Sequence, residues 1–288
     1  MPKDIYEEIV GLRAKGIRAA LATIIASKGA TPRKDMAKML ICEDGQQLGS
    51  IGGGSAEAEV RKEAQSIIET GKAKLLTFDL KDIDPEDSAL VCGGFMEVYV
   101  EPVLPAPTLF IFGAGHVSKA LAEAAKPVGF KIAIVDDRAK YANEDRFPGA
   151  DAFYVDEWQQ ACSRLPINDA SFLFLATRGH QFDLICLRHA IQSPARYVGM
   201  LGSLKKAKIL LGLLEKEGTD PSLFKRVCVP AGLDIGSETP EEIAVSIVAE
   251  LIAVRNKLDI QPLKESLRQM RKESGIRNPH SLRQIPIE

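Results

Sequence analysis

The spacing of hydrophobic and polar positions changes near residue 105. Before that point, apolar positions at helical spacing predict an opening helix that ends before Gly16, and short apolar runs between turn residues predict strands. The expected elements after the opening helix are strands 18–26, 37–42, 46–51, 74–78 and 95–103, and one long helix over 55–69. We therefore expect a smaller α+β domain over residues 1–103.

The rest of the chain alternates short apolar strands with helical segments. The expected strands are 108–112, 131–135, 152–155, 171–176, 196–200 and 226–229, and the expected helices are 116–126, 182–192, 203–217 and 240–256. Such alternation is typical of an α/β fold in which helices cover both faces of a parallel sheet. Thr239 and Glu242 predict a capping box at the start of the last helix. We expect a Rossmann-like domain over residues 108–256, preceded by a proline-rich linker and followed by a basic C-terminal tail, residues 257–288.

Composition narrows the class of protein. A length of 288 residues suits two domains, and the net charge of −2 argues against nucleic acid as the main partner, because no basic excess neutralises phosphates. No apolar run approaches the roughly 18 residues that span a membrane, and the N-terminus lacks the apolar core of a signal peptide. The five cysteines are scattered and never form a C-x-x-C pair. We expect a cytoplasmic protein with free thiols and no membrane contact.

The strand 108–112 runs into a glycine turn and then into a helix, which is the context of a nucleotide-binding turn. Gly113 permits the tight turn, and Gly115 lets a diphosphate approach the backbone. Asp136 follows Gly115 by twenty-one residues, close to the spacing of about 20 at which a Rossmann unit places its ribose-binding acid. Ser118 stands where the full fingerprint has a third glycine. The pattern predicts a Rossmann half without identifying its ligand.

Two further loops are expected at the same edge of the sheet, where open α/β sheets bind ligands. One carries His180, and the other carries Gly202 and Ser203 before a lysine-rich helix. A helix N-terminus near lysines suits an anion, although the lysines also fit a solvated helix face and His180 also fits a loop residue that caps backbone groups. Together, the loops favour a phosphate-bearing ligand.

A second glycine loop lies in the first domain. Gly52, Gly53 and Gly54 precede Ser55 and Glu57, and their N–H groups could hold an anion or form a flexible connection. Cys92 precedes two glycines, so its thiol is either open to a ligand or buried and inert. The histidines lack the spacing of a metal cage, and no nucleophile elbow occurs, so no catalytic residue is assigned.

With these motifs assembled, the chain resembles the xanthine dehydrogenase accessory factor family (XdhC/CoxI-like) over about residues 10–255. The most specific strings are Gly113-Ala114-Gly115-His116 and Gly232-Leu233-Asp234-Ile235-Gly236 followed by Thr239-Pro240-Glu241-Glu242-Ile243-Ala244. The other matching segments are residues 49–54 with Glu57, 91–94, 135–138 and 197–203.

The resemblance implies an accessory role. Family members bind the molybdenum cofactor (molybdopterin), protect it while a cysteine desulfurase supplies its terminal sulfur, and deliver it to a xanthine dehydrogenase-type molybdenum hydroxylase. It implies a homo-oligomer, with the cofactor held at both glycine loops, at His116, Asp136 and His180, and at Gly202 and Ser203. Ser55 replaces a cysteine that the family often has there, and serine is no soft thiolate. Either Cys92 suffices as the metal ligand, or this member handles the cofactor differently, for another hydroxylase.

Two other functions are compatible with the same residues. An NAD(P)-dependent oxidoreductase would use the Rossmann unit directly, although the third glycine is missing and nothing in the sequence pairs the candidate acids and bases for proton transfer. A nucleotide-sensing partner would carry no cofactor. Metal and pterin analysis of the purified protein discriminates among the three.

Overall fold

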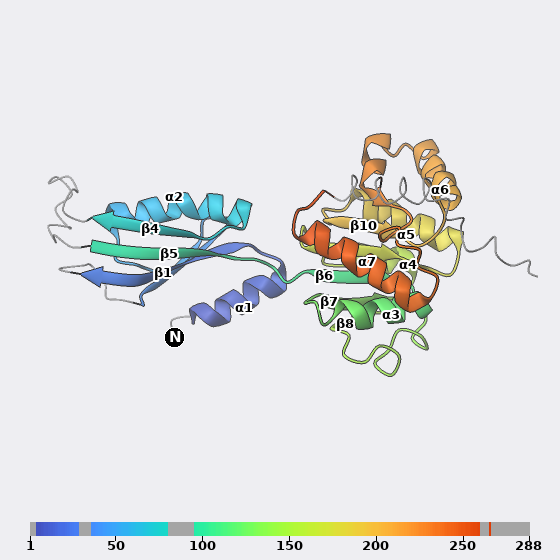
Figure 1. Cartoon of the computed structure of the whole chain (residues 1–288), viewed down its shortest axis with the longest axis horizontal. Helices are drawn as coiled ribbons and strands as arrows, with labels where there is room; N and C mark the ends of the chain where they lie inside the picture. The colour runs from blue at the N-terminus through green and yellow to red at the C-terminus, as the bar shows by residue number, and fades with distance from the viewer. Residues whose placement is uncertain (1–3, 29–35, 80–94, 260–264, 266–288) are drawn as a thin grey trace, which may run out of the picture. The chain divides into compact units, whose positions relative to one another are not determined.

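The computed structural model describes residues 4–28, 36–79, 95–259 and 265. The chain divides into two units, Met1–Ala106 and Pro107–Glu288, which are described separately below (Figure 1). The first contains an antiparallel sheet and the second a parallel sheet. This mixed α/β architecture confirms the predicted fold class.

The first unit is a five-stranded sheet with one helix on each face. Its strands run in the order β3-β2-β1-β5-β4, and each pair of neighbouring strands is antiparallel. The elements are α1 (Ile5–Lys15), β1 (Ala19–Lys28), β2 (Lys38–Cys42), β3 (Gln47–Gly49), α2 (Gly54–Thr70), β4 (Lys74–Asp79) and β5 (Phe95–Val103).

Alternation along β1 separates the two cores of this unit. Ala20, Ala22 and Ile24 pack with the apolar side of α2, whereas Ala19 and Leu21 pack with residues of α1. Successive side chains of a strand point to opposite faces, so one strand contributes to both cores. The long helix therefore lies on one face of the sheet, as Figure 1 shows for α2.

The second unit is a six-stranded parallel sheet. Its order is β11-β10-β9-β6-β7-β8, which in chain order of the strands reads 6-5-4-1-2-3, the order of dinucleotide-binding sheets. The strands are β6 (Thr108–Phe112), β7 (Lys131–Val135), β8 (Ala152–Tyr154), β9 (Ser171–Leu175), β10 (Tyr197–Met200) and β11 (Val227–Cys228).

Helices cover both faces of this sheet (Figure 1). Helices α3 (His116–Ala125) and α7 (Pro240–Arg255) share one apolar core with the sheet, and α4 (Trp158–Arg164), α5 (His180–Gln192) and α6 (Leu204–Lys216) share the other. A 3₁₀ helix, η1 (Pro221–Arg226), precedes β11. The predicted capping box of α7 is confirmed, because Thr239 and Glu242 exchange their hydrogen bonds.

The predicted element bounds hold to within a few residues, but one α-helix, α4, and the 3₁₀ helix η1 were not predicted. Helix α4 spans only seven residues, which is too short to show a helical repeat of hydrophobic positions in the sequence. It is held against the sheet by the buried side chains of Trp158 and Cys162. Helix α5 begins at His180, two residues earlier than predicted. Most of the predicted tail, residues 257–288, lies outside the described residues.

Candidate functional site

The glycine turn between β6 and α3 is packed on one side and open on the other. Gly113 has a φ of +101°, and its N–H donates to the carbonyl of Val135 at 2.8 Å. A Cβ at Gly113 would lie 2.3 Å from the carbonyl oxygen of Ala176, so only glycine allows this approach. A Cβ at Gly115 would meet no atom within 4 Å. The turn is therefore open to a ligand at Gly115.

Asp136, predicted to bind a ribose, is completely buried and bonds to its own chain. Its Oδ2 accepts from the Ala114 amide at 2.9 Å and from Arg138 Nη2 at 3.0 Å, and its Oδ1 accepts from the Arg138 amide at 3.1 Å and Nε at 2.8 Å. A carboxylate has about four lone-pair sites, which these bonds occupy. Burial would raise the pKa of Asp136, but Arg138 and the Ala114 amide hold it below its usual range. Asp136 is a buried anion that supports the glycine turn.

Two arginines stack on one tyrosine beside the turn. The guanidinium carbon of Arg138 lies 4.2 Å from the ring centroid of Tyr141, and that of Arg146 lies 5.5 Å from it. Arg146 Nε also donates to the carbonyl of Ala114 at 3.1 Å. The Ala114 residue is thus held at both of its backbone polar groups, by Asp136 at its N–H and by Arg146 at its oxygen.

A third arginine joins the loops on either side of β6. Arg178, after β9, donates Nη1 and Nη2 to the two carboxylate oxygens of Asp137, after β7, at 2.9 and 2.7 Å. Its guanidinium carbon lies 4.7 Å from the ring centroid of Phe182. Because β6 lies between β7 and β9 in the sheet, this bidentate pair connects the two loops that flank the glycine turn.

Helices α3 and α5 begin in the same way at this edge. Each has a glycine N-cap without a side-chain cap, Gly115 or Gly179, followed by an exposed histidine, His116 or His180. The first N–H groups of a helix have no intrahelical acceptor and carry partial positive charge. The strands that precede these helices, β6 and β9, are adjacent, and the strand order reverses between them. Ligands of open α/β sheets bind at this switch point.

The third predicted loop contains a buried ion pair. Lys206 Nζ lies 2.5 Å from Oδ2 of the completely buried Asp183, whose Oδ1 accepts from Thr177 Oγ1 at 2.7 Å. Ser203 caps α6 by accepting from the amide of Lys206 at 3.2 Å. Lys206 therefore neutralises Asp183, which makes one of the lysines structural.

The glycine loop of the first unit is filled by a carboxylate. Glu57, only 5% exposed, accepts from Gln47 and Ser50 side chains at 2.8 Å each and from the Gly53 amide at 3.0 Å. Arg61 Nη2 lies 3.2 Å from it. Burial would raise the pKa of Glu57, but these hydrogen bonds and Arg61 hold it below its usual range. Glu57 thus occupies one amide of the predicted anion cradle.

The predicted site residues therefore fall into one set in each unit. Gly54 and Ser55 are exposed at the start of α2, and Gly52 is half-buried. The set in the second unit lies at the carboxyl edge of the parallel sheet, after strands β6, β7, β9 and β10. It consists of Gly113, Gly115, His116, Asp136, His180, Gly202 and Ser203. Cys92, the predicted metal ligand, lies outside the described residues.

Sequence reasoning assigned no site role to Arg138 or Arg146, and it did not foresee the Arg178–Asp137 and Asp183–Lys206 ion pairs. Arg178 and Asp137 are forty-one positions apart, so only the fold brings them together. The usable signal was that Arg178 adjoins the His180 loop and that Arg138 follows Asp136 closely.

Comparison with known proteins follows the same division of the chain. The family model of the XdhC Rossmann domain matches residues 109–251, and that of the XdhC and CoxI family matches residues 12–79. The chain belongs to the XdhC/CoxI family.

Two curated relatives and one solved structure are similar to the chain. Uncharacterized protein YqeB of Escherichia coli (strain K12) is 32% identical over 88% of the chain and 46% of its own length. A probable xanthine dehydrogenase component of Bacillus subtilis (strain 168) is 33% identical over 57% of the chain and 47% of its own length. A crystal structure described as a xanthine dehydrogenase from Bacillus halodurans is 25% identical, covers 90% of this chain and 98% of its own, and has a TM-score of 0.49. The chain spans about half the length of the curated relatives.

Two features are absent from the part of the chain that the structure describes. None of the helices there combines the length and the hydrophobicity needed to cross a membrane. Nor do three or more His, Cys, Asp or Glu side chains in the described ranges gather into a metal-binding group.

Proposed function

We propose that this chain is an accessory protein that binds the molybdenum cofactor and delivers it to a xanthine dehydrogenase-type molybdenum hydroxylase in the cytoplasm. One observation carries the proposal. Two helices without side-chain caps, α3 and α5, begin with Gly-His at the switch point of the sheet. A pyranopterin carries a phosphate, and helix N-termini preceded by glycine bind phosphate through their free N–H groups.

The residues present fit such a cargo. The open space over Gly115 admits a phosphate close to the backbone. His116 and His180 are exposed at the two helix starts and would donate to phosphate oxygens. Arg146 and Asp136 hold the backbone of Ala114 at both polar groups, so the turn is organised before a ligand arrives.

Family membership and one relative support the accessory role. The probable xanthine dehydrogenase component of Bacillus subtilis shares 33% of the aligned residues, and the family is that of XdhC and CoxI proteins. We propose further that a cysteine desulfurase supplies the terminal sulfur while the cofactor is bound. Cys92 is the proposed metal ligand on chemical grounds alone, since a thiolate suits molybdenum better than the Ser55 hydroxyl does.

The test is metal and pterin analysis of protein purified from a host that makes the cofactor. Molybdenum measured by mass spectrometry and pterin measured as its fluorescent oxidised derivative should both co-purify with the chain. The protein should also activate an apo-hydroxylase. Protein free of both, with no activation of the hydroxylase, contradicts the proposal.

A matched pair of variants tests the helix start itself. His116→Pro removes the N–H of the first helical residue, where proline is well accepted, and Gly115 before it already has extended backbone with φ of −81° and ψ of −172°. His116→Ala removes the side chain and keeps the N–H. If the amide holds the phosphate, His116→Pro should lose cofactor more severely than His116→Ala does, at unchanged thermal stability. Equal retention by the two variants contradicts the assignment of the amide.

The strand order favours a second candidate, an NAD(P)-dependent oxidoreductase, because a 6-5-4-1-2-3 sheet is that of dinucleotide-binding domains. The oxygens of Asp136 are occupied by Ala114 and Arg138, which leaves no ribose acceptor on this residue. Calorimetric titration with NADH and NADPH tests this candidate, and hydride transfer by the cofactor-free protein would favour it over the accessory role.

A further inference from the structure

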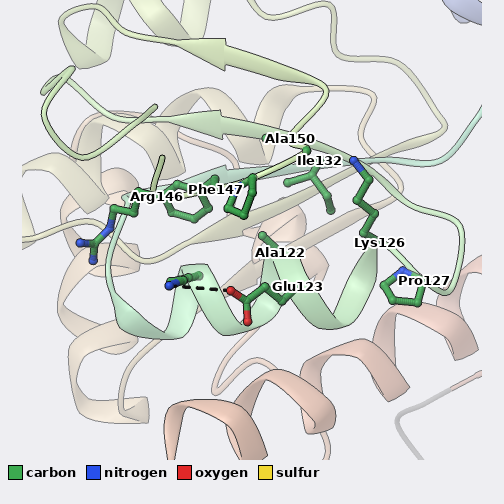
Figure 2. Close-up of a pocket in the computed structure, with 11 residues that line it drawn as sticks. Ala122, Glu123, Lys126, Pro127, Ile132, Arg146, Phe147 and Ala150 are labelled. Carbon is green, nitrogen blue, oxygen red and sulfur yellow. Dashed lines mark ion pairs between the residues drawn. The ribbon is translucent and has the colours of Figure 1, made fainter. Parts of the chain in front are cut away.

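A pocket of about 340 Å³ lies beside α3 (Figure 2). Its walls are one side of α3, the start of β7 and the segment 146–150 that leads to β8. The lining positions on the helix are 119, 122, 123 and 126, which share one helical face because residues three and four apart are neighbours. Its volume falls within the range of small-molecule sites.

The floor of this pocket is apolar and buried. Ala122, Ile132 and Phe147 form it and are 7%, 1% and 3% exposed. Pro127 and Pro148 add ring surfaces at its edge. Flat apolar surfaces of this kind favour an aromatic or other planar body over a branched chain.

The rim of the pocket is cationic. Lys119, Lys126 and Arg146 line it, against the single carboxylate of Glu123. In Figure 2, Lys126 and Arg146 lie at opposite ends of the floor. Lys119 and Glu123 form an exposed pair at 3.9 Å, a separation and exposure at which ion pairs contribute little. Three cations against one carboxylate leave an excess positive charge that suits an anion.

We propose that this pocket binds a small organic anion: a carboxylate, sulfonate or phosphate on a body of one or two aromatic ring systems. The rings lie on Phe147 and Ile132, and the acid group contacts one of the two ammonium groups, that of Lys119 or that of Lys126. This site is additional to the proposed cofactor site, since neither the residues of its floor nor its two lysines are among the residues proposed to bind the cofactor. Two lining residues also contact the glycine turn: Arg146 Nε donates to the Ala114 carbonyl, and the Lys119 amide donates to the Gly115 carbonyl.

The probes are two dyes with the same ring system. The anionic 1-anilinonaphthalene-8-sulfonate carries a sulfonate, whereas N-phenyl-1-naphthylamine is its neutral analogue. Fluorescence titration of the full chain should give one saturable site for the anion and binding weaker by about tenfold or more for the neutral dye, the effect expected for losing one charge-assisted contact.

Variants separate the rim from general surface charge. The double variant Lys119→Met/Lys126→Met keeps the apolar stems and removes both charges, and it should weaken binding of the anionic dye by about tenfold or more. The control Lys62→Met/Lys72→Met makes the same change at two exposed lysines of the first unit and should bind like the parent protein. Ala122→Leu fills the floor and should weaken both dyes. Fluorescence of Trp158, buried in the second unit, verifies that each variant is folded.

Three results would overturn the inference. They are the absence of saturable binding, equal affinity for the two dyes, and unchanged affinity in Lys119→Met/Lys126→Met. None of them bears on molybdenum or pterin content, so failure of this site is distinguishable from failure of the proposed function.

Discussion

Each unit has a loop that runs from a strand through glycines into a helix: residues 49–57 in the first unit and residues 112–118 in the second. A carboxylate bonds to a backbone amide in each loop, but the two carboxylates come from different kinds of element. Glu57 lies on the helix that follows its loop and accepts from the Gly53 amide. Asp136 lies at the end of the neighbouring strand and accepts from the Ala114 amide. The first carboxylate occupies the start of its own helix, whereas the second leaves the start of α3 available. A glycine pattern thus predicts backbone geometry, and the nearest carboxylate decides whether an anion can still bind.

The glycines themselves also differ in how strongly the fold requires them. Gly113 and Gly53 both have positive φ, +101° and +86°. A Cβ at Gly113 would lie 2.3 Å from the Ala176 carbonyl oxygen, whereas a Cβ at Gly53 would meet no atom within 4 Å. Only the first of these two positions combines backbone strain with a steric collision.

Substituting these glycines should have the largest effect. Gly113→Ala should destabilise the second unit by about 3 kcal/mol or more, since it adds a backbone collision to left-handed strain of about 1–2 kcal/mol. Gly53→Ala should cost the first unit about 1–3 kcal/mol from strain alone, because φ of +86° with ψ of −169° is a conformation that essentially only glycine adopts. Urea unfolding measures both, with Trp158 fluorescence reporting on the second unit because it is the single tryptophan.

Gly115→Ala is the matched control in the second loop. Gly115 has φ of −81° and open space at its Cβ position, so this variant should change the free energy of unfolding by less than about 1 kcal/mol. If Gly115→Ala lowered the free energy of unfolding as much as Gly113→Ala, the collision with Ala176 would not be the reason that glycine is required at position 113.

The two supporting carboxylates should come next in magnitude. Asp136→Asn replaces one acceptor oxygen by a donor in a completely buried site and weakens its bonds to Arg138 and Ala114, which should cost about 2–3 kcal/mol. The pH dependence should change as well. Because the folded pKa of Asp136 is lowered, its stabilising effect is present above the unfolded value of about 3.9 and is lost as pH falls through the folded value. The difference in stability between the wild-type and Asp136→Asn proteins should therefore begin to shrink as pH falls below about 4, as urea titrations at several pH values would show.

Local sequence patterns were sufficient to predict the strands, the glycine turn and the α7 capping box, since each depends on residues within a few positions of one another. The spacing of Asp136 from Gly115 correctly predicted that Asp136 directly follows the end of β7. Its hydrogen-bond partners could not be predicted, because the Ala114 amide and the Asp136 carboxylate come together only when β6 and β7 pair in register. Long-range contacts of this kind decide whether an acid is a ligand or a support.

Long-range contacts also account for two residues whose hydrogen-bond and ion-pair partners were not predicted: Lys206, on the helix after the Gly202 loop, and Glu57, beside the glycine loop of the first unit. The lysines of α6 fitted both an anion site and a solvated face, and the structure gives Lys206 a third role, neutralising the buried Asp183. Glu57 was predicted to bind cofactor, and the structure shows it bound to Gln47, Ser50 and Gly53. Buried partners from other elements leave no mark in local hydrophobic periodicity.

Glu57→Gln should have a smaller effect than Asp136→Asn. The amide keeps the acceptor for one partner and presents a donor to the others, so the first unit should lose about 1–2 kcal/mol. The ion pair with Arg61 adds little, since that arginine is half exposed. Far-ultraviolet ellipticity sums over both units, so the unfolding of the first unit is the change in ellipticity that occurs without a change in Trp158 fluorescence. A loss equal to that of Asp136→Asn would contradict the distinction between the two loops.

The smallest effect is expected for the ion pair that joins the loops beside the second turn. Arg178 and Asp137 are 39% and 20% exposed, so solvent screens their attraction despite the bidentate geometry. A double-mutant cycle with Arg178→Ala and Asp137→Asn should give a coupling energy of about 0.5–1 kcal/mol, well below the cost of Asp136→Asn. The coupling should shrink in high salt, whereas the effect of the buried Asp136 should persist. A coupling above about 2 kcal/mol that resists salt would mean that the second turn depends on this outer pair as much as on Asp136.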